Sequence, residues 1–202
     1  LLSYDGTAYF GWQKTESGPS IQETLAKALH ILSPYSPFPE AASRTDKGVH
    51  AEGQVVLVSL QDDKAIPPHT LQKALNAHLP LDIRVLNAEI APDTFHPTLH
   101  AKKKKYRYRI CLNPIQNPIY RRYSWSFRYP IDIEKMTNAA QALIGTHDFS
   151  ALANELEKNP ICTLKSIEMI PLEKDGLEIT IIGDRFLYKM VRNLVGTLLY
   201  IG

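Results

Sequence analysis

Residues 42–51 read Ala-Ser-Arg-Thr-Asp-Lys-Gly-Val-His-Ala, a polar insert between two segments that lean apolar. Asp46 followed by Lys47 and Gly48 is typical of a β-turn, because an Asp side chain accepts a hydrogen bond from the backbone two residues on. The same residues also fit a functional loop that holds the Asp46 carboxylate at the head of a strand. Gly48 and Gly53 would then let the backbone approach a ligand closely. The local sequence leaves both interpretations open.

Strand and helix signals alternate outward from this loop. Ser20 and Glu23 have the spacing of a capping box, which predicts a helix that starts at Ile21 and presents one apolar face as far as Leu32. The other elements expected before residue 98 are strands at 1–5, 9–13, 54–60 and 83–90 and a helix at 67–76.

The second half of the sequence repeats this plan. Asp132 predicts the start of a helix that ends at Gly145. The other elements expected there are strands at 101–112, 120–129, 163–171 and 177–182 and a helix at 186–200. Two successive sets of strands with helices between them predict an α+β fold. We expect two similar halves, residues 1–98 and 99–202, around an antiparallel sheet with helices packed on it.

The composition is that of an ordinary globular protein of 202 residues, 44% of them hydrophobic, and it excludes disordered and fibrous classes. Lys and Arg number 23 and Asp and Glu 21, a net charge of +2, so a nucleic acid could meet only a local basic patch. Two cysteines argue against a disulfide scaffold or a cysteine-based zinc site. No apolar run approaches the roughly 20 residues that span a bilayer. The first residues also lack the features of a signal peptide, so we expect a cytoplasmic protein.

The basic residues concentrate in residues 102–109, where six of the eight side chains are cationic. On a strand, Lys105 and Arg107 would share one face, while Tyr106 and Tyr108 share the other. Cations beside aromatic rings are the combination that binds the phosphates and bases of single-stranded RNA. A charged strand with two tyrosines in the core is the alternative interpretation.

Arg192 interrupts an otherwise mostly apolar run over residues 186–196. Its helical neighbours predict a partly desolvated guanidinium, which should seek a carboxylate or a phosphate. The alternative is an arginine at the rim of the core, with its stem buried and its charged end in water.

No motif for a cofactor or a metal is present. The sequence has neither a glycine-rich phosphate loop nor a dinucleotide-binding fingerprint. His96 and His100 have the spacing of a zinc pair on a helix, but Pro97 disfavours a helix there. We therefore expect neither a cofactor nor a metal.

Taken together, these motifs closely resemble those of the tRNA pseudouridine synthase A family. Residues 42–51 match its Gly-Arg-Thr-Asp-x-Gly-Val-His signature, and seven further segments match in order and approximate spacing. They are Tyr4-Asp5-Gly6 with Phe10-Gly11-Trp12-Gln13, Ile21-Gln22-Glu23, Asn76-Ala77-His78-Leu79-Pro80, Phe95-His96, Lys105-Tyr106-Arg107-Tyr108, Gly145-Thr146-His147-Asp148-Phe149 and Met190-Val191-Arg192-Asn193-Leu194-Val195-Gly196. Two positions depart from the family pattern: Ser43 replaces the usual Gly, and Thr98 stands where an Arg is frequent.

The resemblance implies an isomerase that converts uridine to pseudouridine in tRNA, at positions 38–40 of the anticodon stem-loop. It implies the pseudouridine synthase fold of two ferredoxin-like (RRM-like) halves, and a homodimer with tRNA lying across both subunits. The resemblance assigns Asp46 as the catalytic aspartate, Tyr106 as the active-site tyrosine and Arg192 as the partner of the aspartate. Arg44 is expected to hold the flipped-out nucleotide.

The implied reaction moves the bond of ribose C1′ from uracil N1 to C5, so it requires no redox cofactor and no ATP. Asp46 would attack either the uracil ring or C1′, and the sequence leaves both open. Tyr106 would stack on the flipped base and take the C5 proton, while Lys103, Lys105 and Arg107 would hold the tRNA backbone. The alternative function is an RNA-binding or RNA-chaperone module that keeps the fold without turnover.

Overall fold

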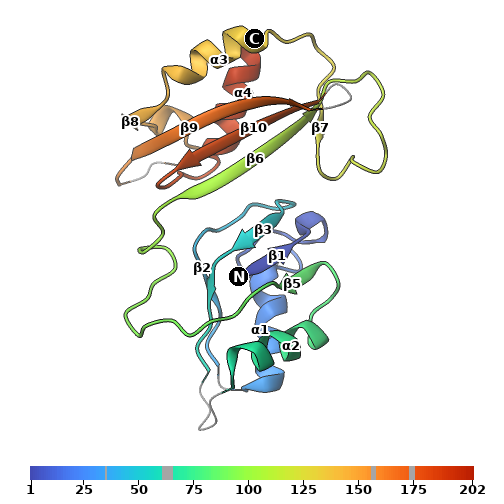
Figure 1. Ribbon diagram of the computed structural model, residues 1–202, viewed down its shortest axis with the longest axis vertical. Helices are drawn as coiled ribbons and strands as arrows, with labels where there is room; N and C mark the ends of the chain where they lie inside the picture. Colours follow the sequence, from blue (N-terminus) through green and yellow to red (C-terminus); the bar gives the residue numbers. More distant parts are fainter. Residues whose placement is uncertain (35, 61–65, 156–157, 173–175) are drawn as a thin grey trace. The chain divides into compact units, whose positions relative to one another are not determined.

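A computed structural model of the chain describes residues 1–34, 36–60, 66–155, 158–172 and 176–202 (Figure 1). The fold separates into two compact units, Leu1–Ala101 and Lys102–Gly202. The sequence placed the division after residue 98, three residues earlier. Each unit has its own hydrophobic core.

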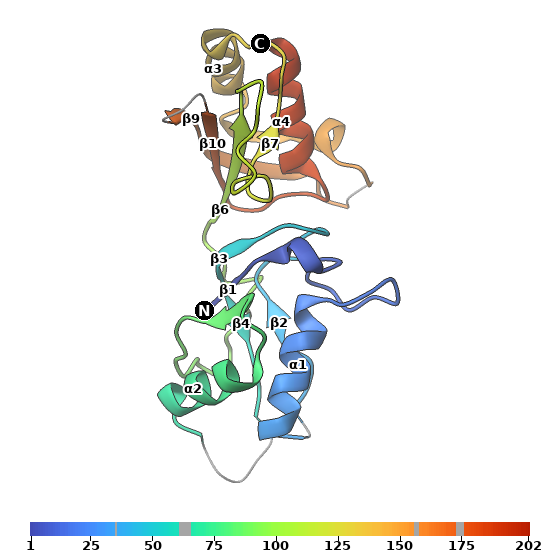
Figure 2. The ribbon, with the colours of Figure 1, turned by 90° about the vertical axis from the view of Figure 1, so that its right-hand side faces the viewer.

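The first unit is a small antiparallel β-structure with two helices. Its elements are β1 (Leu2–Tyr4), η1 (Gly6–Ala8), α1 (Ile21–Leu32), β2 (Glu40–Ala41), β3 (Ala51–Gln54), β4 (Val56–Leu57), α2 (Pro68–His78) and β5 (Ile83–Val85). Strand β1 lies between β3 and β5 and is antiparallel to both, while β2 pairs with β4. Val55 alone separates β3 from β4, and its carbonyl accepts a hydrogen bond from Ala42 N–H at 2.9 Å. Helices α1 and α2 pack against each other (Figure 2).

Helix α1 confirms the capping-box prediction at its N-terminus. Ser20 Oγ accepts a hydrogen bond from Glu23 N–H at 3.2 Å, and Ser20 itself is fully buried. The side chains of Ile21, Leu25 and Leu29 recur at helical spacing and are at most 2% exposed. The apolar face of α1 therefore forms the centre of the first core.

The second unit is a five-stranded sheet with two helices on one face (Figure 1). Its elements are β6 (Lys104–Cys111), β7 (Trp125–Ser126), α3 (Ile133–Gln141), β8 (Gly145–Asp148), η2 (Ser150–Leu152), β9 (Ile161–Leu172), β10 (Gly176–Gly183) and α4 (Met190–Ile201). The strand order is β7-β6-β10-β9-β8, and only the pairing of β6 with β7 is parallel among the described strands. Leu177, Ile179 and Ile181 of β10 are completely buried in the core beneath α3 and α4.

Three strand predictions are wrong in extent. Residues 9–13, all described, form no strand, because their backbone bonds to a loop and Gly11 has a φ of +98°. The strand expected at 54–60 is interrupted at Val55, which divides it between β3 and β4. The strand expected at 120–129 shrinks to β7, because residues 120–124 form successive turns.

Three other boundaries also differ from the predictions. Strand β5 ends at Val85 rather than Ile90, because its partner β1 is only three residues long. Helix α3 ends at Gln141, and the chain then turns so that Gly145, with a φ of +120°, begins β8. Helix α4 starts at Met190 rather than at residue 186, because Lys189 adopts a left-handed conformation with a φ of +59°.

Candidate functional site

The loop that carries Asp46 is fixed by backbone hydrogen bonds to residues 9–12. Trp12 N–H donates to the Thr45 carbonyl at 3.0 Å, and Gly48 N–H donates to the Tyr9 carbonyl at 3.2 Å. These bonds flank Asp46 on both sides in the chain, so the position of the loop is set by a segment more than 30 residues away in the sequence.

Two glycines make this close approach possible. A Cβ atom on Gly11 would lie 2.5 Å from the Thr45 carbonyl oxygen, and its φ of +98° disfavours any other residue. A Cβ atom on Gly6 would overlap the carbonyl oxygen of Val49. The glycines of the segments Tyr4-Asp5-Gly6 and Phe10-Gly11 are therefore required by contact with residues 45–49.

Side chains add further connections to the start of this loop. Tyr4 Oη and Thr45 Oγ1 share a hydrogen bond of 2.8 Å. The Gln54 amide bonds Ser43 twice, accepting from its N–H at 3.2 Å and donating to its carbonyl at 2.6 Å. Ser43 does not have a positive φ, since Lys189 is the one non-glycine residue with that conformation in the described part of the chain. A serine in place of the usual glycine therefore causes no backbone strain here.

An Asp–His pair lies at the other end of the loop. His50 Nδ1 is 3.0 Å from Asp5 Oδ1 and accepts a hydrogen bond from Gly6 N–H at 3.1 Å. The same carboxylate oxygen accepts bonds from the N–H and hydroxyl of Thr7 at 2.9 and 2.6 Å. Sequence analysis did not connect Asp5 with His50. The available signal was that Asp5 and His50 both belong to segments that match the family.

The two predicted site residues of this unit differ in exposure. Asp46 is half-buried, and Arg44 is exposed two residues earlier in the same loop. The loop therefore presents a partly desolvated carboxylate and a cation close together in the chain. Such a pair can hold a polar, anionic substrate next to an oxygen nucleophile.

Thr98, the second departure from the family pattern, has a structural role. Its hydroxyl donates a hydrogen bond to the Ala41 carbonyl at 3.1 Å, which connects the segment to β2. His96 Nδ1 accepts bonds from the N–H groups of Thr98 and Leu99, both at 3.2 Å. The Nε2 atom of His96 lies 3.7 Å from Glu40. His96 is therefore occupied in stabilising its own loop.

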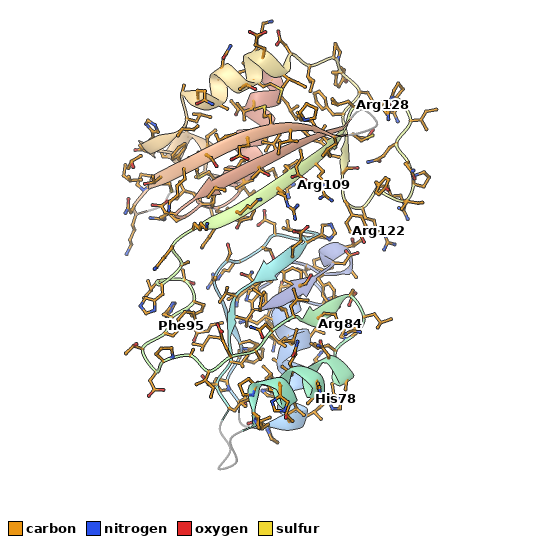
Figure 3. The ribbon with its side chains drawn as sticks, viewed as in Figure 1. His78, Arg84, Phe95, Arg109, Arg122 and Arg128 are labelled. Atoms are coloured by element: carbon orange, nitrogen blue, oxygen red, sulfur yellow. The ribbon has the colours of Figure 1, made fainter. Side chains whose placement is uncertain are left out.

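In the second unit, β6 confirms the predicted alternation of charged and aromatic side chains. Lys105, Arg107 and Arg109 are exposed, whereas Tyr106 and Tyr108 are half-buried. Arg109, labelled in Figure 3, forms an ion pair of 2.9 Å with Glu178 on the neighbouring strand β10. Lys103 is exposed just before β6 begins.

Tyr106 packs on the side of the sheet that faces the core. Its ring meets the ring of Phe186 edge to face, with centroids 4.9 Å apart. Lys104 occupies the same side of β6, two residues earlier, and burial lowers the pKa of its ammonium group, with a further contribution from Arg185. Sequence analysis counted Lys104 among the basic residues of 102–109 but gave it no separate role.

Of the two interpretations of Arg192, its exposed side chain agrees with a position at the rim of the core. Gly196 and Tyr200, one and two turns further along α4, are exposed on the same side, while Leu194 and Leu198 are buried. The apolar residues around Arg192 therefore belong mainly to the opposite face of the helix. Arg192 lines a shallow pocket of about 450 Å³, whose other lining residues are Ala151, Leu152, Asn193, Gly196, Thr197 and Tyr200.

Neither a membrane-spanning helix nor a metal cluster is found within the described ranges. No helix there is long and apolar enough to cross a membrane. No group of three or more His, Cys, Asp and Glu side chains in those ranges is arranged to hold a metal ion.

The structure thus divides the predicted site residues between the two units. The first unit holds Arg44 and Asp46 together on one loop, and the second unit holds the remaining five. Those five are Lys103, Lys105, Tyr106 and Arg107 at or beside β6, and Arg192 on α4.

Comparison with known proteins identifies the family. A family model described as tRNA pseudouridine synthase matches residues 2–98 and 139–202, which include Asp46 and Arg192. The chain belongs to the tRNA pseudouridine synthase family. The expected isomerase is thereby confirmed. Tyr106 lies outside the residues that the family model matches, within the interval 99–138.

Curated relatives of this synthase family align along nearly all of the chain. It is 49% identical to tRNA pseudouridine synthase A 2 of Protochlamydia amoebophila, over all of this chain and 78% of the relative. It is 41% identical to tRNA pseudouridine synthase A of Thermoanaerobacter sp. strain X514, over all of this chain and 82% of the relative. It is 40% identical to the enzyme of the same name from Chlamydia trachomatis serovar L2b, over all of this chain and 76% of the relative.

Proposed function

We propose that this protein converts uridine to pseudouridine in tRNA, at positions 38–40 of the anticodon stem-loop. The observation that carries the proposal is the Asp46 loop, which has the family signature and is fixed on both sides by hydrogen bonds from residues 9–12. A nucleophile needs a fixed position of this kind, because a small displacement of a reacting group lowers the reaction rate by a large factor.

The reaction is an isomerisation in which all atoms are retained. The bond between ribose C1′ and uracil N1 breaks, the base turns, and a bond between C1′ and C5 forms. C5 loses its proton and N1 gains one, so no electrons enter or leave. Asp46 acts as the carboxylate nucleophile, attacking either the uracil ring or C1′.

Tyr106 and Arg192 complete the proposed catalytic set. The phenol of Tyr106 removes the C5 proton, and its contact with Phe186 supports the ring in a fixed orientation. Arg192 is the proposed partner of the Asp46 carboxylate. Its exposure at the edge of a pocket supports a role toward a group outside its own helix.

Four basic residues are proposed to bind RNA. Arg44 holds the flipped-out nucleotide, and Lys103, Lys105 and Arg107 contact the phosphate backbone. Exposure of all four side chains supports this assignment. Binding through these residues releases counterions and therefore weakens steeply with salt.

We also propose the finer architecture that the resemblance implies. The order β1-α1-β2-β3/β4-α2-β5, with β1 between β3 and β5, supports a ferredoxin-like first half. The order β6-α3-β9-β10-α4, with the short strands β7 and β8 before and after α3, supports a similar second half. A homodimer is supported by the exposed aromatic side chains around β7, which are Tyr120, Tyr123, Trp125 and Tyr129. Figure 3 shows Arg122 and Arg128 in the same segment. A tRNA substrate supports action in the cytoplasm.

The deciding experiment measures tritium release from tRNA labelled at uridine C5. Full-length wild-type protein should release tritium, and Asp46→Asn should release none while binding tRNA with nearly unchanged affinity. Asp93→Asn, a change of an exposed aspartate in the same unit, is the matched control and should behave as wild type.

Two outcomes would contradict the proposal. Tritium release by Asp46→Asn at the wild-type rate would remove Asp46 from the mechanism. Tight tRNA binding with no release by the wild type would favour the RNA-binding module instead. Mapping the pseudouridine formed would test positions 38–40.

A further inference from the structure

A lysine is held against an aromatic ring directly beside the proposed nucleophile. Lys47 Nζ lies 3.9 Å from the centroid of the Phe10 ring, well inside the range of about 6 Å in which cation–π attraction operates. Lys47 follows Asp46 in the chain, and its side chain is exposed. A second lysine of the same unit, Lys14, lies over the Phe38 ring at the longer distance of 5.3 Å.

Phe10 has a fixed position relative to the Asp46 loop. The residues on either side of it bond to that loop, through the Tyr9 carbonyl with Gly48 N–H and through Trp12 N–H with the Thr45 carbonyl. The same two backbone hydrogen bonds therefore position both Asp46 and the contact between Lys47 and Phe10.

The ring of Phe10 is also fixed from another direction. Phe10 N–H donates to the Pro19 carbonyl at 2.8 Å. A Cβ atom on Gly18 would lie only 2.6 Å from Phe10 Cε2, so the backbone at Gly18 packs directly against the ring. The backbone at Gly18 thus limits the movement of the Phe10 ring on one side.

The charge of Lys47 is available to a ligand. No carboxylate lies within ion-pair distance of its ammonium group anywhere in the described residues. Contact with a ring face leaves N–H donors of the ammonium group directed elsewhere. Lysine binds phosphate as a point charge with rotatable donors.

We propose that Lys47 binds a phosphate of the RNA backbone next to the uridine that is isomerised. The inference rests on the proposed function, because it takes Asp46 as the carboxylate that meets that uridine. Consecutive Cα atoms are about 3.8 Å apart, and the proposal places this cation and the Asp46 carboxylate at the same nucleotide. A nucleotide that leaves its stack brings its flanking phosphates with it. Because Phe10 already restrains the lysine, less conformational freedom is lost on binding.

The test compares Lys47→Ala with Lys14→Ala in the full-length enzyme, by measuring tRNA affinity over a range of salt concentrations. Lys47→Ala should bind about tenfold more weakly, with the slope of log K against log salt reduced by about one. Lys14→Ala should keep the wild-type affinity and slope. Tritium release at subsaturating tRNA should fall with the affinity in Lys47→Ala and stay at the wild-type rate in Lys14→Ala.

Two further variants separate charge from the aromatic support. Lys47→Arg keeps both the positive charge and the ring contact, so it should restore affinity and slope. Phe10→Leu keeps the charge but removes the ring, so it should weaken binding while the salt slope stays at the wild-type value. Phe38→Leu is the matched control and should have no effect on binding.

An active enzyme whose Lys47→Ala variant binds tRNA with wild-type affinity and salt slope would overturn this inference alone. An inactive wild type would overturn the proposed function and this inference with it.

Discussion

The two units hold their proposed site residues in different ways. In the first unit, Asp46 lies on an irregular loop whose position depends on hydrogen bonds from residues 9–12 and on glycines that allow close contact. In the second unit, Tyr106 lies on a regular strand and Arg192 on a regular helix. The difference shows which site residues depend on distant parts of the chain and which depend on local periodicity.

The same difference appears in the space that each unit leaves for a side chain in place of glycine. Gly11 and Gly6 are in contact with the carbonyls of the Asp46 loop, whereas a Cβ atom on Gly196, one turn after Arg192, would have no neighbour within 4 Å. Replacing these glycines with alanine should therefore lower the stability of the protein in the first unit and raise it in the second.

The largest expected effect concerns the regular strand of the second unit. Tyr106→Phe should lower the rate of tritium release by roughly 10²- to 10⁴-fold, the usual contribution of a general base, while leaving the edge-to-face contact with Phe186 in place. Tyr108→Phe removes a hydroxyl from the same face of β6 and should retain activity. Single-turnover assays of both variants make the comparison. Equal losses in the two would mean that strand β6, rather than the Tyr106 hydroxyl, had been disturbed.

The next effect concerns the Asp46 loop of the first unit. Gly11→Ala should destabilise the protein by about 1–3 kcal/mol from the positive φ alone, and by more because the new Cβ would lie 2.5 Å from the Thr45 carbonyl oxygen. Gly48→Ala is the matched control, because its φ is also positive, +78°, but no atom lies within 4 Å of the added Cβ. Urea denaturation measures both variants. A loss for Gly11→Ala no greater than for Gly48→Ala would show that the contact with Thr45 is unimportant.

A smaller effect of opposite sign is expected on α4. Gly196→Ala should stabilise the protein by about 0.5–1 kcal/mol, because alanine restricts the unfolded chain and favours the helix. The urea midpoint should rise accordingly. A fall in the midpoint would indicate that the helix surface near Arg192 is packed more closely than the open space around Gly196 implies.

The smallest effect concerns the start of α3. Asp132 accepts a hydrogen bond from Lys135 N–H at 3.0 Å, and this bond is the main cause that lowers the carboxyl pKa below its ordinary value of 3.8. A carboxyl group whose pKa is lower in the folded state than in the unfolded state stabilises the fold at any pH above the unfolded-state pKa. This stabilisation is lost as the pH falls through the folded-state pKa. Asp132→Asn keeps an acceptor for the cap but cannot titrate, so its stability should fall less than that of the wild type between about pH 5 and pH 2.

Melting temperatures across that pH range measure the difference. Glu134→Gln, which removes a charge from the same first turn, controls for the change in net charge. Identical pH profiles for wild type and Asp132→Asn would contradict a stabilising role for this cap.

Local periodicity explains the parts of the fold that could be predicted. The alternation along β6 follows from the two-residue repeat of a strand, and the buried face of α1 follows from the helical repeat of its leucines and isoleucine. The caps at Ser20 and Asp132 were also predicted correctly, since each depends on residues at most three apart. These features need no information from distant segments.

Predictions failed where distant segments decide the conformation. Residues 9–13 have a strand-like composition, but their backbone groups bond to residues 45–48 and to 18–22 rather than to a sheet. For Arg192 the sequence left a desolvated position and a rim position open, and its direction around α4 agrees with the rim, on the exposed side with Gly196 and Tyr200. The link between Asp5 and His50 joins positions 45 residues apart, and no local pattern indicates it.

The sequence by itself determined the family resemblance, which named Asp46 as the candidate nucleophile, and the helix caps and strand alternation, because these depend on residue types at short spacing. Only the tertiary structure decided how the Asp46 loop is fixed, why glycines are required at positions 6 and 11, and that Lys47 lies on Phe10. The physical reason is that hydrogen bonds and steric contacts between distant segments depend on atomic positions in three dimensions. Residue order alone does not specify which backbone groups meet.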